Sequence, residues 1–187
     1  MNERISRPRR SFIFTPGLQP EMFSKALLSG ADMVCIELED GIAPKDKAKA
    51  RRLALALFET SRKSDEVECI VRINSLREKY GIQDVNAILE TKTPPESIMM
   101  PKVQTPDEVV ILDELLSDSG HDTLIHVIIE TNEALEAAFE IAHSSSRIES
   151  LFFGGIDMAA ELRCKNDWDQ LLYARSRVVH AAASARL

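Results

Sequence analysis

Long hydrophobic runs are missing from this sequence, and so are the basic clusters typical of nucleic-acid-binding proteins. No apolar stretch is long enough to cross a bilayer, and the arginine-rich start is not followed by the apolar segment of a signal peptide. The net charge is −7, and aromatic residues, at 5%, do not accompany any lysine or arginine cluster. We therefore expect a cytoplasmic protein with no membrane anchor and no nucleic-acid partner.

Cysteine is also scarce. The three cysteines, Cys35, Cys69 and Cys164, form an odd set without the spacing of metal ligands. Two of them lie in apolar stretches, so we expect reduced side chains rather than disulfides or a thiolate metal site. Hydrophobic residues make up 44% of the 187 residues, which is enough to build the core of an ordinary globular domain.

Six short apolar runs are predicted to be strands of a parallel sheet. The clearest is 124–131, where a nearly continuous apolar run ends in Glu130. The others are 11–14, 32–38, 69–74, 98–103 and 151–153. Strands and helices alternate about six times without a linker or a low-complexity tract, which indicates one α/β domain of βα repeats over residues 1–187.

Helical patterns occupy the intervals between these strands. Pro44 opens one of them, and residues 61–65 are expected to close it. Its basic residues are expected to face water: Lys45, Lys47, Lys49 and Arg51. Thr105 to Glu108 has the pattern of a capping box with proline in the first turn. The predicted apolar face of the helix after the fifth strand consists of Leu135, Ala138, Phe139 and Ala142.

Charged side chains follow five of the six predicted strands. The six exits are Thr15-Pro16-Gly17, Glu39-Asp40, Arg72 to Asn74, Lys102, Glu130 and Gly155 to Asp157. Because the carboxyl ends of parallel strands meet at one rim, these residues should surround one site. Glu130 and Asp157 offer hard oxygen ligands and suggest a Mg²⁺ site shared with substrate oxygens. Arg72, among β-branched neighbours, predicts an anionic partner such as a substrate carboxylate.

Two simpler interpretations of these exits stay open. Each carboxylate could cap the helix that follows it, since acidic residues are common at helix starts. The whole set could also be a salt-bridge network at the edge of the sheet. None of the four histidines falls at a strand exit, so the residues suggest no general base.

Six short motifs occur in a fixed order along the chain. They are Arg10-Ser-Phe-Ile-Phe-Thr-Pro-Gly17, Gly30-Ala-Asp32 with Leu38-Glu-Asp40, Val71-Arg-Ile-Asn74, Pro101-Lys-Val103, Ile129-Glu-Thr131 and Phe153-Gly-Gly-Ile-Asp157. Together, from Arg10 to about Leu162, they resemble the citrate lyase β-subunit-like and malyl-CoA lyase group of the HpcH/HpaI aldolase superfamily. The resemblance implies a TIM (β/α)8 barrel and a Mg²⁺-dependent carbon–carbon lyase.

The implied reaction is a Claisen-type cleavage, or formation, of a 3-hydroxyacyl-CoA thioester such as citramalyl-, malyl- or citryl-CoA. The partners would be a 2-oxo acid and an acyl-CoA. By position, the resemblance implies that Glu130 and Asp157 hold the metal. The implied catalytic set is Arg72, Glu39 and Asp40. The implied substrate-binding set is Arg72, Glu130, Gly155, Thr15 and Pro16.

The predicted fold is shorter than a complete barrel. Eight βα units typically take about 250 residues, and only about six are found here. We therefore expect a C-terminally shortened barrel, either truncated or a shortened homologue, that forms a homo-oligomer to cover its sheet edges. Two alternatives to the thioester lyase stay open: a metal-dependent aldolase acting on free hydroxy-oxo acids, and a non-catalytic shortened homologue.

Overall fold

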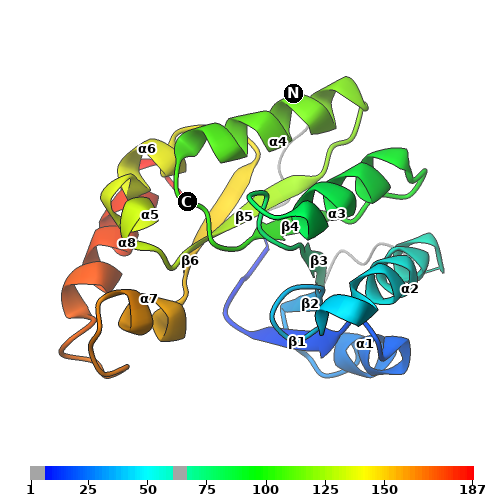
Figure 1. Cartoon of the computed structure of the whole chain (residues 1–187), viewed down its shortest axis with the longest axis horizontal. Helices are drawn as coiled ribbons and strands as arrows, with labels where there is room; N and C mark the ends of the chain where they lie inside the picture. Colours follow the sequence, from blue (N-terminus) through cyan, green and yellow to red (C-terminus); the bar gives the residue numbers. More distant parts are fainter. Residues whose placement is uncertain (1–6, 61–66) are drawn as a thin grey trace.

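Six parallel strands form one sheet in the order of the sequence (Figure 1). The computed structural model describes residues 7–60 and 67–187. The strands are β1 (Phe12–Pro16), β2 (Met33–Glu37), β3 (Glu68–Arg72), β4 (Ser97–Met100), β5 (Leu124–Ile129) and β6 (Ile148–Phe153). All six predicted strands are confirmed. The predicted helix end at 61–65 lies outside the described residues.

Helices connect the strands and pack against one face of the sheet. They are α1 (Pro20–Leu27), the 3₁₀ turn η1 (Pro44–Asp46), α2 (Lys47–Thr60), α3 (Lys79–Glu90), α4 (Pro106–Asp118), α5 (Asn132–Glu136), α6 (Ala138–Ala142), α7 (Gly155–Glu161) and α8 (Leu172–Ser184). Pro106 opens α4, and Glu108 Oε1 accepts a hydrogen bond from the Thr105 N–H at 3.2 Å, as the capping box predicts.

Alternate strand residues face two different environments. In β2, Val34 and Ile36 join the large core under the helices, whereas Met33 and Cys35 lie on the opposite, inner face of the sheet. The same alternation in the other strands gives the inner face a small apolar cluster: Met33, Cys35, Ile70, Met99 and Ile128. A period of two with both faces buried explains why the strands read as continuous apolar runs.

The sheet curls so that its two edge strands meet across the inner face. Five spacings of about 4.8 Å would separate β1 from β6 by roughly 24 Å in a flat sheet. Instead, the ring centroids of Phe12 in β1 and Phe152 in β6 lie 5.2 Å apart. Arg9, just before β1, also contacts Glu149 of β6 at 3.1 Å. Sequential parallel βα units in a curled sheet confirm the predicted shortened-barrel fold class.

The structure corrects three expectations about helix faces. Phe139, expected on the buried face after β5, is 49% exposed, because the chain breaks into α5 and α6 there and does not keep one helical phase. Lys47, expected in water, is only 7% exposed, and Arg51, also expected in water, has a largely buried side chain whose Nε lies 2.6 Å from Asp84 Oδ1. The three cysteines are unpaired thiols, as predicted. None of the helices in the described part of the chain is long and apolar enough to cross a membrane.

Candidate functional site

The inner face of the sheet has a charged layer at each end and the apolar cluster between them. At the amino ends of the strands lies the floor, made of Glu68, Ser97, His126 and Ser150. At the carboxyl ends lies the rim, made of Glu37, Glu39, Asp40, Arg72, Lys102, Glu130 and Asp157. Ligands of α/β barrels bind at the carboxyl ends of the strands, so the rim is the candidate site.

Glu130 follows β5 and is 3% exposed. Its Oε1 accepts a hydrogen bond from the Lys102 backbone N–H at 2.8 Å. Burial raises the pKa of this carboxyl to about 7, and the nearby carboxylates of Asp157 and Glu39 push it in the same direction. Gly154 leaves room for the carboxylate, because a Cβ there would lie 2.3 Å from Glu130 Oε2. A buried carboxylate facing other carboxylates is suited to bind a cation.

Arg72 ends β3 and points along the inner face toward β2. Its Nε donates to Glu37 Oε2 at 2.6 Å, and its Nη1 lies 3.2 Å from Glu39 Oε2. The guanidinium also stacks over the Phe14 ring, with Cζ 4.7 Å from the centroid. Glu37 and Arg72 are opposite each other in the β2–β3 register, which explains their pairing. The anionic partners observed for Arg72 are therefore carboxylates of the chain itself.

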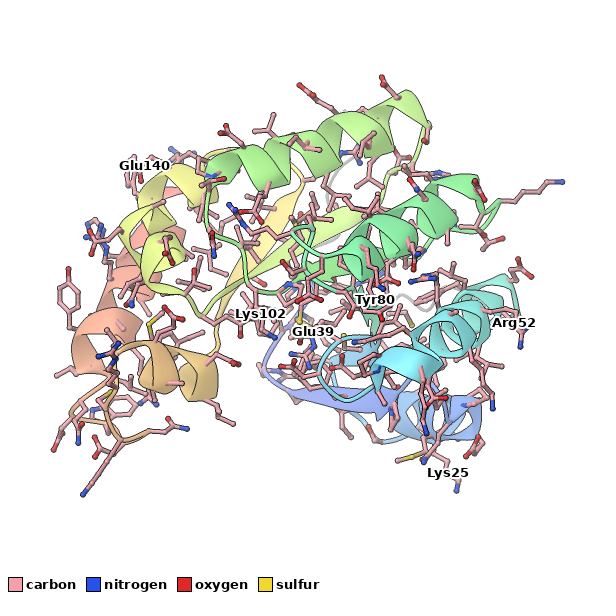
Figure 2. All side chains as sticks on the ribbon, viewed as in Figure 1. Lys25, Glu39, Arg52, Tyr80, Lys102 and Glu140 are labelled. Carbon is pink, nitrogen blue, oxygen red and sulfur yellow. The ribbon has the colours of Figure 1, made fainter. Side chains whose placement is uncertain are left out.

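Lys102 follows β4 and contacts both sides of the rim, Glu130 through its backbone N–H and Glu39 through its ammonium. Figure 2 labels Lys102 and Glu39 near each other at the centre of the molecule. Its Nζ pairs with Glu39 and with Asp40 Oδ1, the latter at 2.9 Å. Although burial opposes it, the hydrogen bonds to these two carboxylates raise the pKa of the Lys102 ammonium. Glu39 is itself buried, and that burial raises its pKa. The sequence pattern places Lys102 at a strand exit as one of two cations suited to an anionic substrate, but assigns it no individual role.

Lys47 is buried beneath the acidic turn that follows β2. Its Nζ donates to the carbonyl oxygens of Leu38 at 2.8 Å and Glu39 at 2.6 Å, and to Asn74 Oδ1 at 2.5 Å. Asn74 Nδ2 in turn donates to Asp84 Oδ2 at 2.6 Å. The expectation that Lys47 faces water was wrong because the first turn of α2 packs against the strand ends. From there the long side chain reaches back to the turn.

The other residues expected at the site lie around the rim. Thr15 and Pro16 belong to β1 itself, and the buried Thr15 hydroxyl donates to the Cys35 carbonyl at 3.4 Å. Gly155 opens α7, and Asp157 lies in the first turn of that helix. The structure thus brings Glu39, Asp40, Arg72, Glu130 and Asp157 to one rim. The residue that sequence reasoning missed is Glu37, whose only signal was its place in the register opposite Arg72.

The donor set at the rim fits a magnesium ion that shares its coordination with substrate. No group of three or more histidine, cysteine or acidic side chains is gathered closely enough to hold a metal by itself among the residues described. Glu130 and Asp157 supply two hard carboxylates; burial raises the pKa of Glu130, and the Asp157 carboxylate adds to that rise, so a cation between them would favour the ionised form. Mg²⁺ commonly takes one or two protein carboxylates and completes its shell with substrate oxygens and water.

Residues 10–187 match the family described as HpcH/HpaI aldolase/citrate lyase. The chain belongs to this family. The HpcH/HpaI relatives include citrate lyase subunit beta of Escherichia coli strain K12, which is 30% identical over 99% of this chain and 63% of its own length. The L-malyl-CoA/beta-methylmalyl-CoA lyase of Cereibacter sphaeroides ATCC 17025 is 34% identical over 84% of this chain and 51% of its own length.

A solved structure of this family has the same fold as the chain. It is the citrate lyase beta subunit of M. tuberculosis complexed with oxaloacetate and magnesium. The TM-score is 0.75 at 26% identity, and the match covers 95% of this chain and 77% of that one. The present chain spans less than two thirds of the length of the two curated relatives.

Proposed function

We propose that this chain is a Mg²⁺-dependent carbon–carbon lyase that acts on a 3-hydroxyacyl-CoA thioester and holds the metal and the oxo acid at its rim. The observation that supports this most is the Glu130 carboxylate, which is buried beside Asp157 and Glu39 at the same rim as Arg72 and Lys102. The family relatives named as citrate lyase and malyl-CoA lyase subunits support the reaction class. We also propose that residues 1–187 form one partial barrel domain.

In this proposal Glu130 and Asp157 hold the metal together with the carboxylate and carbonyl oxygens of a 2-oxo acid. A bound Mg²⁺ supplies Lewis-acid stabilisation of the carbonyl or hydroxyl oxygen at which charge develops. Arg72 provides a fixed guanidinium for the substrate carboxylate, and Phe14 beneath it limits the directions in which the guanidinium turns. The curled sheet keeps these groups on one face, so the oxo acid is oriented before any bond breaks.

Glu39 and Asp40 form the acidic pair proposed to act beside the substrate. Glu39 Oε2 is buried without a hydrogen-bond partner among the described residues, although it lies 3.2 Å from Arg72 Nη1. A buried carboxylate oxygen with spare acceptor capacity is suited to hold a proton donor, such as a water or a substrate hydroxyl. No histidine of the described chain lies at the rim: His126, the buried one, belongs to the floor.

Calorimetric titration of the 187-residue chain with oxaloacetate, with and without Mg²⁺, tests this proposal. We expect binding that requires the metal in the wild type and is lost in Glu130→Gln and in Asp157→Asn. The proposal is contradicted if oxaloacetate binds equally well without Mg²⁺, or if both variants bind it as tightly as the wild type does. A folded chain that binds neither ligand would favour the non-catalytic homologue.

A second assay separates the thioester lyase from an aldolase of free hydroxy-oxo acids. The chain is mixed with malyl-CoA, with citramalyl-CoA and with free 4-hydroxy-2-oxo acids, and the 2-oxo acid released is measured by its reduction in a coupled dehydrogenase assay. The proposal expects release from a thioester only. Release from the free acids at a similar rate identifies the aldolase instead. The cytoplasmic location and the homo-oligomer remain predictions.

A further inference from the structure

Lys102 occupies an unusual backbone conformation at the centre of the rim. Its φ is +51°, in the left-handed region that favours glycine. In the described residues, the other non-glycine positions with positive φ are Arg163 and Arg186, which lie in turns that follow helices. Lys102 instead lies two residues beyond the end of β4, between Pro101 and Val103. A lysine in this left-handed conformation costs conformational energy that a glycine would not, so we look for contacts of Lys102 that compensate for it.

The left-handed turn aims two different groups of Lys102 at two different parts of the rim. The backbone N–H donates to Glu130 Oε1 at 2.8 Å, on the β5 side. The ammonium extends the opposite way and pairs with Glu39 and Asp40, which follow β2. One residue therefore connects the proposed metal ligand to the acidic pair, although they are separated by some ninety positions in the sequence.

Charge balance explains why the ammonium matters there. The rim carries five carboxyl groups against the cations Arg72 and Lys102, and Arg72 already faces Glu37 and Glu39. A 2-oxo acid brings further negative charge to this surface. Without the ammonium, Glu39 and Asp40 would repel an anionic ligand and would themselves attract the metal.

We propose that Lys102 is a positioning residue that orients Glu130 through its backbone N–H and neutralises Glu39 and Asp40 through its ammonium, so that the rim accepts an anionic oxo acid. This inference rests on the proposed function. It predicts that the charge of Lys102 has opposite effects on the binding of Mg²⁺ and on the binding of the oxo acid. Removing the ammonium strengthens or preserves the binding of Mg²⁺ alone and weakens the binding of the oxo acid.

The test compares Lys102→Met, which keeps the stem and the backbone N–H, with Lys102→Arg, which keeps the cation. Calorimetry measures the dissociation constant of Mg²⁺ alone and of oxaloacetate at saturating Mg²⁺. Lys102→Met is expected to weaken oxaloacetate at least tenfold without weakening Mg²⁺, and Lys102→Arg to recover most of that loss. Lys45→Met, at an exposed lysine after β2, removes the same net charge and is expected to change neither constant more than twofold.

The outcomes separate a charge role from a general structural one. Equal weakening of Mg²⁺ and oxaloacetate in Lys102→Met overturns the proposal, because it indicates a collapsed rim. No change in either constant overturns it as well. If the wild type binds neither ligand, the proposed function fails, and thermal melting still tests Lys102. The double variant Lys102→Met with Glu39→Gln should then melt above Lys102→Met alone, since it removes the uncompensated carboxylate. A melting temperature of the double variant equal to or below that of Lys102→Met contradicts the proposed charge role of Lys102.

Discussion

The floor and the rim are two buried charged clusters on the same strands, yet their carboxyl groups behave in opposite ways. Glu68 in the floor accepts hydrogen bonds from Ser97 at 2.5 Å and Arg9 at 2.7 Å, and lies 2.7 Å from His126 Nε2. Burial alone would raise its pKa, but these partners lower it to about 2. At the rim, burial and neighbouring carboxylates raise the pKa of Glu130 to about 7.

The difference lies in the partners and not in burial. The floor carboxylate has cationic and neutral donors on several sides, so the folded protein favours its ionised form. Among the described residues the rim carboxylate accepts one backbone hydrogen bond and has two acidic neighbours, so the folded protein disfavours its ionised form. A buried carboxylate therefore does not by itself mark a functional site. Our hypothesis is that a buried carboxylate whose charge is not compensated by neighbouring donors or cations does mark one, and the following variants test it.

The largest effect on stability is expected in the floor. Glu68→Ala leaves His126 without its carboxylate and leaves Arg9 with only Glu149 among the described residues, and should lower the free energy of unfolding by about 3–5 kcal/mol, the usual cost of breaking a buried ion pair. Urea unfolding at pH 7 measures it. Glu140→Ala, at an exposed glutamate of α6, is the control and should stay within about 0.5 kcal/mol of the wild type. If Glu68→Ala lowers the free energy of unfolding no more than Glu140→Ala does, the floor does not stabilise the fold.

At the rim, removing the Glu130 charge should raise the free energy of unfolding instead of lowering it. The folded protein holds the Glu130 proton more tightly than the unfolded chain does, since the pKa rises from 4.5 to about 7. The wild type therefore loses stability as the pH rises between these two values, by up to about 3 kcal/mol at 1.36 kcal/mol per pKa unit. In EDTA, Glu130→Gln should be more stable than the wild type at pH 8, and the gap should close near pH 4.5. A gap that is constant with pH would refute this account.

Binding of Mg²⁺ at the rim should raise the stability of the folded protein. At a concentration 100 times its dissociation constant, a ligand of the folded state adds about 2.7 kcal/mol. We expect Mg²⁺ to raise the melting temperature of the wild type more at pH 8 than at pH 6, because binding needs the ionised Glu130. Differential scanning fluorimetry measures this, with Ca²⁺ as a comparison. A shift that persists in Glu130→Gln would place the ion elsewhere.

The smallest expected change in stability comes from one methyl group. In Gly154→Ala the added Cβ would meet Glu130 Oε2 at 2.3 Å and Glu130 Cβ at 2.6 Å, so the carboxylate must move. Overpacking of this kind costs about 1–3 kcal/mol, and here it should also remove the Mg²⁺ shift. Gly120→Ala is the control, because Gly120 has φ +70° and open space around it. It should lose stability and keep the shift, and loss of the shift in both variants would make the result nonspecific.

Much of the fold could be predicted because burial on both faces leaves a plain pattern. Each strand reads as an apolar run ended by a charged or glycine-rich exit, and the exits identify the rim. The convergence of Glu39, Asp40, Arg72, Glu130 and Asp157 followed from parallel strands alone. Their individual roles stay predictions, because position at a rim does not say which group touches a substrate.

The rest depended on geometry that a linear pattern does not contain. The pairing of Glu37 with Arg72 follows from strand register, which hydrophobic periodicity does not fix between two fully buried strands. Lys47 was placed in water because helical periodicity describes a helix face and not the reach of a long side chain from its first turn. The left-handed backbone of Lys102 has no sequence signal, since the position carries no glycine.

The strictly sequential strand order also sets how the chain is built during synthesis. Each strand pairs with the one made immediately before it, so every pairing needs only the helical connection between the two strands to be made first. A ribosome releasing the chain from its amino end therefore delivers Arg72 and the acidic pair before Lys102, and Glu130 and Asp157 last. The growing sheet holds its own internal cation at the acidic pair before its proposed metal ligands emerge.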